Sequence, residues 1–444
     1  MKISVVGLGK LGAPLAAVFA SKGFQVVGTD LNPAAVAAIN AGRAPVDEPG
    51  LQDLITSSAH RLSATDDALS AVSGTDATFI IVPTPSDSSG KFSNEYALQA
   101  MATVGQGLRQ KNGYHLVVMT STVMPGSTGG VLREALERHS GRSVGPSLGL
   151  CYNPEFIALG SVVRDMLRPD MILIGESDPR AGDLLEGIYR ESCDNEPAFR
   201  RMNFVNAELT KISVNTFVTT KISYANMLAD ICDHLPGADV DIVTHAVGAD
   251  SRVGPKYLRG AIGYGGPCFP RDNVAFAALA RSIGANPELA EATDRVNRYQ
   301  IERVLGAVQA RIEGRGVVGI LGLSYKPDTS VIEESQGVAL AERLLAEGHA
   351  VVAFDPKALE AAQARLRGRL QGAASADACV RAADVIVVMT PWPAFRSLGP
   401  GAFERPGRRM TVIDCWRILP SDVRDVADIV YVGQCEAVPT ADAV

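Results

Sequence analysis

The chain has 444 residues, of which 46% are hydrophobic and 20% are charged, and its formal net charge is −7. This length exceeds what one ordinary hydrophobic core supports, so we expect two or three domains. The negative charge argues against a nucleic-acid partner, which needs a basic surface, and no apolar run approaches the ~20 residues of a membrane span.

The N-terminal segment predicts a strand, a glycine-rich turn, a helix and a second strand. These parts occupy residues 2–6, the turn with Gly7, Gly9 and Gly12, residues 13–21, and residues 25–29. In such a turn the first glycine permits the tight bend, the second lets the backbone approach a pyrophosphate, and the third allows close helix packing. Asp30 ends the second strand, where it would bind an adenosine ribose and repel a 2′-phosphate. The segment therefore predicts an NAD-binding Rossmann domain.

Further buried strands alternate with helical segments at both ends of the chain. The expected strands cover residues 78–82, 116–119, 317–321, 351–354 and 383–388. This alternation predicts an α/β protein with two Rossmann-like, doubly wound parallel-sheet domains. The turn after the strand at 317–321 lacks the full set of glycines, so it either binds a different nucleotide, with Lys326 near a phosphate, or binds nothing.

A helical region separates the two blocks. Residues 206–235 contain no proline or glycine, and their apolar side chains recur at helical spacing. We expect one long helix that joins the end domains and packs against a second copy, giving a homodimer. The predicted boundaries are 1–205 for the NAD-binding domain, 206–300 for the helical central domain, and 301–444 for the second Rossmann-like domain.

The most informative segment is Gly263-Tyr264-Gly265-Gly266-Pro267-Cys268-Phe269-Pro270-Arg271-Asp272. Three glycines and two prolines in these ten residues exclude a regular helix or strand. It presents a thiol close to a cation and a carboxylate, an arrangement that favours a reactive thiolate. From spacing alone, Cys268 is either a covalent catalyst or a buried structural cysteine.

Four other positions add polar groups that suit an active site. Lys211 and Asn215 are four residues apart on one face of the predicted long helix, where they form either an oxyanion site or a solvated edge. Glu155 and Thr122 each follow an apolar strand, at the sheet edge where open α/β sheets bind ligands.

The seven cysteines are scattered and include no CxxC pair. This pattern is typical of a reduced, cytoplasmic protein, and it predicts neither a disulfide framework nor a metal site.

Together these residues resemble the UDP-glucose/GDP-mannose dehydrogenase family over nearly the whole chain. The motifs that carry the resemblance are the glycine turn at 7–12, Glu48-Pro49-Gly50-Leu51, Ser121-Thr122-Val123, Asn153-Pro154-Glu155-Phe156, Lys211 with Asn215, the cysteine loop at 263–272, and Gly322-Leu323-Ser324-Tyr325-Lys326-Pro327. The occurrence of all these motifs in this order is highly specific for the family. The resemblance implies an NAD-dependent four-electron oxidation of the C6 alcohol of a nucleotide sugar to the uronic acid.

The resemblance also implies catalytic and cofactor-binding roles. Cys268 would trap the intermediate aldehyde as a thiohemiacetal, which a second hydride transfer converts to a thioester. Lys211 and Asn215 would stabilise the oxyanion, Asp272 would aid proton transfer through water, and Glu155 would be the base for hydrolysis. Asp30 would hold the NAD ribose, while Thr84 and Thr122 would line the cofactor cleft, where Thr122 also counts among the catalytic residues.

Several residues occupy positions that the resemblance assigns to substrate binding. Besides Glu155 and Lys211, these residues are Arg252, Tyr257, Gly265 and Lys326. Arg252 matches a residue that reaches across a dimer interface in the family.

The chain departs from the family pattern at three positions. Leu159 replaces a second glutamate, Glu333 replaces an arginine, and Arg271 replaces a lysine in the cysteine loop. The first two changes place the hydrolysis network and a contact to the cofactor phosphates in doubt, and the third keeps the charge but not the shape.

The sequence leaves several substrates open. UDP-glucose is favoured because Lys326 and Trp392-Pro393-Ala394-Phe395 resemble the nucleotide site of that branch. GDP-mannose, a UDP-N-acetylhexosamine and a dTDP-sugar remain open. Two other functions also remain, a two-electron β-hydroxyacid dehydrogenase and a non-catalytic nucleotide-sugar sensor.

Overall fold

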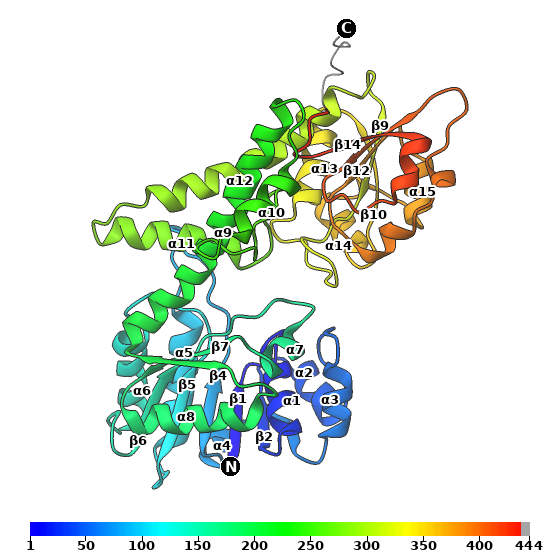
Figure 1. Ribbon diagram of the computed structural model, residues 1–444. Coiled ribbons are helices and arrows are strands. Elements are labelled where there is room, and N and C mark those ends of the chain that lie inside the picture. The colour runs from blue at the N-terminus through cyan, green and yellow to red at the C-terminus, as the bar shows by residue number, and fades with distance from the viewer. Residues whose placement is uncertain (437–444) are drawn as a thin grey trace. The chain divides into compact units, whose positions relative to one another are not determined.

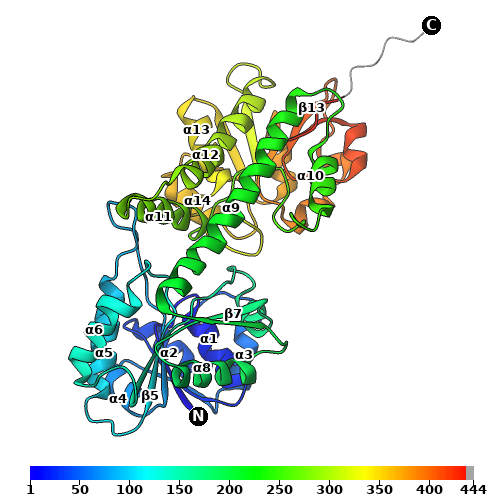
Figure 2. The ribbon, with the colours of Figure 1, turned by 60° about the vertical axis from the view of Figure 1, so that its left-hand side comes forward.

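The computed structural model describes residues 1–436. They form two compact units, Met1–Val214 and the described chain from Asn215 onward. The boundary lies inside α9 (Phe204–His234), a helix of 31 residues that confirms the predicted long helix. It is the continuous green ribbon of Figures 1 and 2. The division into three domains at 205/206 and 300/301 stays a prediction.

The first unit contains an eight-stranded sheet in the order β3-β2-β1-β4-β5-β6-β7-β8. Its strands are β1 (Lys2–Val6), β2 (Gln25–Thr29), β3 (Leu62–Thr65), β4 (Ala77–Ile80), β5 (His115–Met119), β6 (Leu148–Tyr152), β7 (Met171–Glu176) and β8 (Ala198–Met202). Neighbouring strands are parallel except for β6 and β7, which pair antiparallel. Because the strand order reverses between β1 and β4, a ligand crevice is expected at their carboxyl ends.

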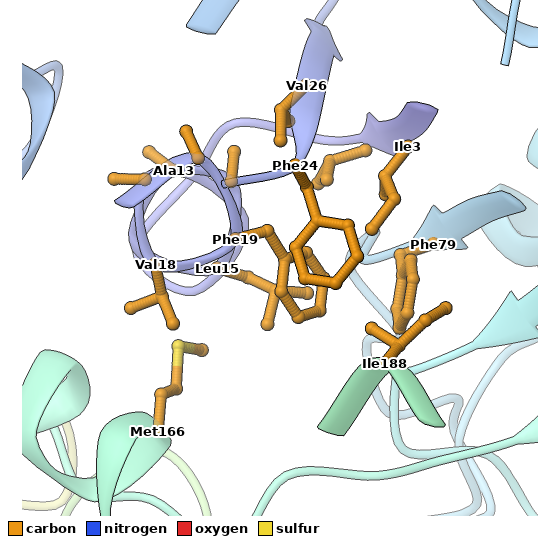
Figure 3. Packing of buried hydrophobic residues seen from close by; sticks show 14 of the residues in the cluster. Ile3, Ala13, Leu15, Val18, Phe19, Phe24, Val26, Phe79, Met166 and Ile188 are labelled. Carbon is orange, nitrogen blue, oxygen red and sulfur yellow. The ribbon is translucent and has the colours of Figure 1, made fainter. Parts of the chain in front are cut away.

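Helices cover both faces of this sheet. They are α1 (Gly12–Ser21), α2 (Pro33–Asn40), α3 (Leu51–Ser57), α4 (Ala68–Ser73), α5 (Glu95–Leu108), α6 (Arg133–Ser140), α7 (Val162–Leu167) and α8 (Pro179–Ser192). Alternate residues of β5 enter two different cores: Leu116 packs with residues of α1 and α8, whereas Val117 packs with residues of α5 and α6. In the first core, Phe19 of α1 contacts Phe24 and Phe79 at centroid distances of 6.0 and 4.9 Å (Figure 3). Strands buried on both faces explain the continuous apolar runs in the sequence.

The second unit combines long helices with a six-stranded parallel sheet in the order β11-β10-β9-β12-β13-β14. The helices are the rest of α9, α10 (Val240–Ala249), α11 (Phe269–Ser282), α12 (Glu288–Gln309), α13 (Gln336–Ala346), α14 (Leu359–Arg365) and α15 (Ala376–Arg381). The strands are β9 (Val317–Leu321), β10 (Ala350–Phe354), β11 (Gln371–Gly372), β12 (Val385–Val388), β13 (Met410–Asp414) and β14 (Ala427–Tyr431). The predicted fold class, two parallel-sheet α/β parts with a helical middle, is therefore confirmed.

Element ends differ from the sequence prediction by one or two residues. The strand expected over 78–82 ends at Ile80, because the N–H and C=O of Val82 bond to the Ser121 hydroxyl (2.8 and 2.7 Å) instead of to a neighbouring strand. Within residues 1–436, none of the helices combines the length and the apolar character needed to cross a bilayer.

Candidate active site

The glycine turn of the first unit leaves space on one side only. Gly7 has a φ of +99°, and a Cβ on it would lie 2.0 Å from the Ile81 carbonyl oxygen. A Cβ on Gly12 would lie 1.8 Å from the Gly7 carbonyl oxygen, whereas a Cβ on Gly9 would meet no atom within 4 Å. The first and third glycines therefore close the turn, while the open face at Gly9 lets a pyrophosphate approach the backbone. These residues fit the predicted NAD site.

Asp30 follows β2 and faces this turn. Its Oδ2 accepts a hydrogen bond from Leu8 N (2.6 Å), and its Oδ1 accepts one from Asn32 N (2.7 Å). The residue remains partly exposed. The carboxylate is thus oriented by backbone donors and remains partly exposed, and its binding to the NAD ribose stays a prediction.

Thr84 and Thr122 lie together beyond the carboxyl ends of β4 and β5. The Thr84 hydroxyl donates to the Thr122 carbonyl oxygen (2.8 Å). Since these two strands border the crevice beside β1, the two predicted cofactor-cleft residues share one edge of the sheet with the glycine turn.

Glu155 and Lys211 also meet in the first unit. The Lys211 ammonium group donates to the backbone carbonyl of Glu155 (2.8 Å) and lies 4.8 Å above the Phe156 ring. Lys211 is buried, with only 7% of its surface exposed. Since a buried cation needs local compensation, the Lys211 ammonium group can attract an anion or a developing oxyanion. The helix position is therefore not a solvated edge.

Tyr189 of α8 adds a partner that sequence reasoning missed. Its hydroxyl lies 2.5 Å from Asn153 Oδ1 and 3.4 Å from Glu155 Oε1. Desolvation raises the pKa of Glu155 to about 7, against the lowering effects of Lys211 and of the Tyr189 hydrogen bond. A carboxyl group with this pKa can accept a proton near neutral pH. No spacing signal links Tyr189 to Glu155, because helix packing alone brings them together.

In the second unit, two asparagines hold the backbone of the cysteine loop. Asn226 of α9 bonds to Ala261 N (2.9 Å) and to the Ile262 carbonyl oxygen (2.8 Å). Asn297 of α12 bonds to Tyr264 N (2.7 Å) and to the Tyr264 carbonyl oxygen (3.0 Å). Each amide satisfies a buried donor and a buried acceptor, which fixes the backbone at residues 261–264. The last four residues of the segment, 269–272, begin α11, so the prediction that the segment contains no regular helix is wrong there, because proline is tolerated in the first turn of a helix.

Glycines let the same loop lie against the segment that carries Lys326. A Cβ on Gly265 would lie 2.2 Å from the Glu334 carbonyl oxygen, and one on Gly266 would lie 2.6 Å from the Tyr325 ring. Gly266 N also donates to the Glu333 carbonyl oxygen (2.9 Å). The predicted nucleophile loop and the predicted nucleotide loop are thus direct neighbours. Gly265 has a packing reason to be glycine, and its assignment to substrate binding remains a prediction.

Cys268 stands at the N-cap position of α11 and is exposed. It is therefore not the buried structural cysteine that the sequence left open. Asp272, one turn later, is 1% exposed, and its Oδ2 accepts a hydrogen bond from Asn215 (2.6 Å). Arg271 forms a longer ion pair with Asp272 (3.9 Å). The structure thus brings three of the predicted catalytic residues, Cys268, Asp272 and Asn215, to one end of α11.

Arg252 and Tyr257 lie on the surface ahead of this loop. The Arg252 side chain is 87% exposed and pairs with Asp250. Tyr257 has a φ of 62° and is half exposed, and its ring lies 6.4 Å from that of Phe269, the residue after Cys268. Tyr257 is therefore near the cysteine, whereas no described contact links Arg252 to it.

One expectation from the sequence is wrong, and the structure shows the surroundings of two of the departures from the family pattern. Trp392 and Phe395, taken as part of a nucleotide site, are 5% and 0% exposed and belong to the core of the second sheet. Leu159, which replaces a family glutamate, packs against the main core of the first unit. Glu333 remains exposed, and the bond to Gly266 uses its backbone, so the structure gives its carboxylate no role.

The described residues contain no disulfide and no group of three His, Cys, Asp or Glu side chains placed to hold a metal ion. What they contain is a glycine turn between β1 and α1, an acid at the end of β2, and the strand reversal beside them. This fold and site define an NAD-dependent oxidoreductase.

Comparison with known proteins identifies the family. The chain belongs to the UDP-glucose/GDP-mannose dehydrogenase family, whose NAD-binding domain matches residues 1–193, central domain residues 205–299 and UDP-binding domain residues 319–421. It is accordingly an NAD-dependent nucleotide-sugar dehydrogenase.

Individual relatives agree over most of their length. The chain is 38% identical to a UDP-glucose 6-dehydrogenase of Haloferax volcanii, with 94% of this chain and 97% of that protein covered. It is 33% identical to a GDP-mannose 6-dehydrogenase of Pseudomonas putida, covering 80% and 81%. Among solved structures, a UDP-glucose dehydrogenase of Pyrobaculum islandicum matches with a TM-score of 0.89, 35% identity and 98% of both chains covered.

Proposed function

We propose that this enzyme oxidises the C6 alcohol of UDP-glucose to UDP-glucuronate in two hydride transfers, with Cys268 as the covalent nucleophile. The observation that carries the proposal is the position of Cys268, exposed at the start of α11 in a loop fixed against the Lys326 segment. The positive end of the helix dipole favours an anion at a helix start, which suits a thiolate. The 14-residue length of α11 gives this end a developed dipole.

In the first oxidation the substrate loses a hydride from C6 and a proton from its hydroxyl, which gives an aldehyde. The Cys268 thiolate adds to the aldehyde carbon, and the oxyanion takes up a proton to complete the thiohemiacetal. Loss of the second hydride from the same carbon and of the hydroxyl proton leaves a thioester. Water then hydrolyses the thioester, releasing the carboxylate and the thiol. NAD supplies the hydride acceptor for both oxidations and is held by the glycine turn and Asp30.

We assign the supporting roles by the charge and surroundings of each side chain. Lys211 is a buried cation, and we give it the role that its family position implies, stabilisation of an oxyanion. Asn215 orients Asp272 through their hydrogen bond, and Asp272 relays protons through water. Glu155, with its pKa of about 7, accepts a proton from the hydrolytic water. We assign the remaining residues by their family positions. Thr122 lines the cofactor cleft and takes part in catalysis, and the substrate-binding residues are Arg252, Tyr257, Gly265 and Lys326.

UDP-glucose is the first choice of substrate because the UDP-binding family model covers residues 319–421 and because the Haloferax relative bears that name over 94% of the chain. The GDP-mannose enzymes match over a smaller share, 80%. The same chemistry on GDP-mannose, a UDP-N-acetylhexosamine or a dTDP-sugar is the second candidate. A two-electron β-hydroxyacid dehydrogenase is disfavoured, since a family model matches the second Rossmann-like part as well.

The decisive experiment counts NADH formed per sugar consumed at 340 nm, with excess NAD and limiting UDP-glucose, GDP-mannose or UDP-N-acetylglucosamine in separate assays. We expect two NADH per UDP-glucose. One NADH per sugar would replace the covalent mechanism by a simple alcohol oxidation. No NADH with any nucleotide sugar would favour the non-catalytic sensor.

We also propose that the enzyme is a cytoplasmic homodimer that associates through α9. Its side chains Phe217, Tyr224 and Ile231 are spaced by seven residues, which places them on one face of the helix, and they are 66%, 47% and 52% exposed. An apolar stripe of this kind on a central helix suits a second copy of the same chain.

A further inference from the structure

The segment that carries Lys326 begins at Ser324, and every polar group of Ser324 is bonded. Its N–H and its hydroxyl donate to Asp355 Oδ2 (2.9 and 3.0 Å), and its carbonyl accepts from the Thr390 hydroxyl (2.7 Å). The indole N–H of Trp392 lies 3.1 Å from the Ser324 hydroxyl and 3.0 Å from Asp355 Oδ2. Ser324 is therefore held from both sides, two residues before Lys326.

Asp355 stands where Asp30 stands in the first sheet, at the end of the second strand of a βαβ unit. Asp30 is partly exposed, whereas Asp355 is 3% exposed. Besides the bonds to Ser324 and Trp392, its Oδ2 accepts from Leu323 N (2.7 Å), and its Oδ1 accepts from Lys357 N (2.9 Å) and Ala358 N (2.7 Å). The acid at this position is thus predicted to bind a ribose in the first domain (Asp30), whereas in the second domain (Asp355) it accepts hydrogen bonds from the protein.

The turn geometry is otherwise the same in both domains. Gly322 has a φ of +102°, and a Cβ on Gly337 would lie 2.3 Å from the Gly322 carbonyl oxygen, which matches the relation of Gly12 to Gly7. The difference is the long segment between these two glycines, which carries Tyr325 and Lys326. Because Asp355 is buried and hydrogen-bonded to protein groups, it is not available to a ribose. The segment with Tyr325 and Lys326 is therefore the part of the turn that can contact a nucleotide.

We propose that Trp392 is a positioning residue for the nucleotide part of the substrate: its indole N–H, shared between Ser324 and Asp355, fixes the segment that presents Lys326. This proposal rests on the proposed function only in taking UDP as the group that Lys326 meets. Because Tyr325 of the same segment lies against Gly266, the bond also keeps the nucleotide loop in register with the cysteine loop.

Trp392→Phe tests the proposal, because phenylalanine keeps an aromatic ring in the core but lacks the indole N–H and is smaller than indole. The chain contains two tryptophans, and Trp416→Phe is the matched control. Trp416 lies in the same domain, and its indole donates to the Met389 carbonyl oxygen (2.9 Å), with no described bond to Ser324. Both variants thus lose an indole N–H donor and undergo the same ring truncation, and only Trp392→Phe is expected to loosen the Lys326 segment.

We expect Trp392→Phe to raise the Kd for UDP, measured by calorimetry, and the KM for the nucleotide sugar by roughly tenfold, the loss of one hydrogen bond to a charged group. The kcat and the KM for NAD should stay within about twofold. A higher KM with unchanged kcat is expected when a variant loses binding energy that is equal in the ground state and the transition state. Trp416→Phe should change none of these values. An unchanged UDP affinity in Trp392→Phe, or an equal loss in both variants, would overturn the proposal.

A second variant separates positioning from packing. Ser324→Ala removes the hydroxyl that the indole contacts, so its effect on UDP affinity should not add to that of Trp392→Phe. If the effects of the two substitutions on UDP affinity were fully additive, the two side chains would act independently, and this result would contradict the proposal. Because UDP binding requires no turnover, weaker binding in Trp392→Phe would still support the positioning role if the wild-type enzyme produced no NADH, and only the proposed reaction would then fail.

Discussion

At the scale of single residues, the seven cysteines show how surroundings divide one residue type into different roles. Burial raises the pKa of Cys379 to about 12 and that of Cys193 to about 11, so these thiols remain protonated at neutral pH. Cys151 and Cys415 are also buried, and burial raises their pKa values. Cys268 is the exposed cysteine of the described chain, at a helix start that favours an anion.

Cys268 should therefore be the first cysteine that iodoacetamide alkylates at pH 7.5, as mapped by peptide mass spectrometry, and bound nucleotide sugar should protect it. Cys268→Ser should lower uronate formation by at least about a thousandfold, because serine is a much weaker nucleophile at this pH. Cys435→Ser, a partly exposed control, should retain activity. Full activity in Cys268→Ser would rule out covalent catalysis.

Glu155 predicts the pH dependence of the hydrolytic step. Its pKa is raised to about 7, and it acts as a base only when deprotonated, so the rate should fall as the pH drops through 7. The hydrogen bond from Tyr189 lowers this pKa, and its loss in Tyr189→Phe should move the acid limb to higher pH. The measurement is the pH profile of thioester hydrolysis in single-turnover assays.

In the same series, Tyr114→Phe is the matched control, because Tyr114 stacks on Arg180 in the first unit and has no described contact with Glu155. It should leave the profile in place. If the pH profile of Tyr189→Phe coincided with that of the wild type, Tyr189 would have no influence on the pKa of the base Glu155.

At the scale of elements, buried carboxylates hold the loops that carry the site. Glu48 of the Glu-Pro-Gly-Leu motif accepts hydrogen bonds from Gly160 N (2.9 Å) and Val162 N (2.7 Å), which anchors the start of α7 and the loop after Glu155. Glu208 of α9 is fully buried and accepts from Gly126 N (2.6 Å) and Thr128 N (2.7 Å) in the loop after Thr122. One helix thereby supplies Lys211 and fixes a cofactor loop.

Glu208→Gln should destabilise the first unit by about 2–4 kcal/mol, because an amide NH₂ would face one of two backbone donors that the carboxylate now satisfies. Thermal unfolding should show a lower midpoint, and the KM for NAD should rise as the loop loosens. Glu134→Gln on the exposed surface of α6 serves as the control and should change neither value. Equal stability of the two variants would contradict an anchoring role for Glu208.

At the scale of the whole molecule, association through α9 links the oligomeric state to activity. Ile231→Glu places a charge in the exposed apolar stripe and should shift the protein from dimer to monomer in size-exclusion chromatography with light scattering. Leu69→Glu, at an exposed apolar position of α4 (44%), should leave the dimer intact.

If Arg252 completes the substrate site of a second copy, as its family position implies, the Ile231→Glu monomer should also lose affinity for the nucleotide sugar. Arg252 fits this role because its side chain extends into solvent, 87% exposed, with Asp250 as its described partner. A fully active monomer would show that one chain forms the whole substrate site and that Arg252 of a second copy is not needed.

The sequence by itself determined the fold class, the cofactor and the family. Strands buried on both faces need long apolar runs, a pyrophosphate needs glycines at fixed spacing, and a ribose needs an acid at the end of the second strand, so each leaves a local mark in the sequence. The position of Glu155 after a strand and the pair Lys211 and Asn215 on one helix were predicted in the same way, because the period of the element fixes which residues share a face.

Only the tertiary structure decided which side chains support these groups. Tyr189 approaches Glu155 from a helix 34 residues away in the chain, and Asp355 meets Trp392 across 37 residues. Packing also assigned Trp392 to the core instead of the ligand surface, and it showed why Gly265 must be glycine. Contacts of this kind leave no spacing signal, since they arise where separate strands and helices close on one another, and burial then sets the pKa of groups such as Glu155.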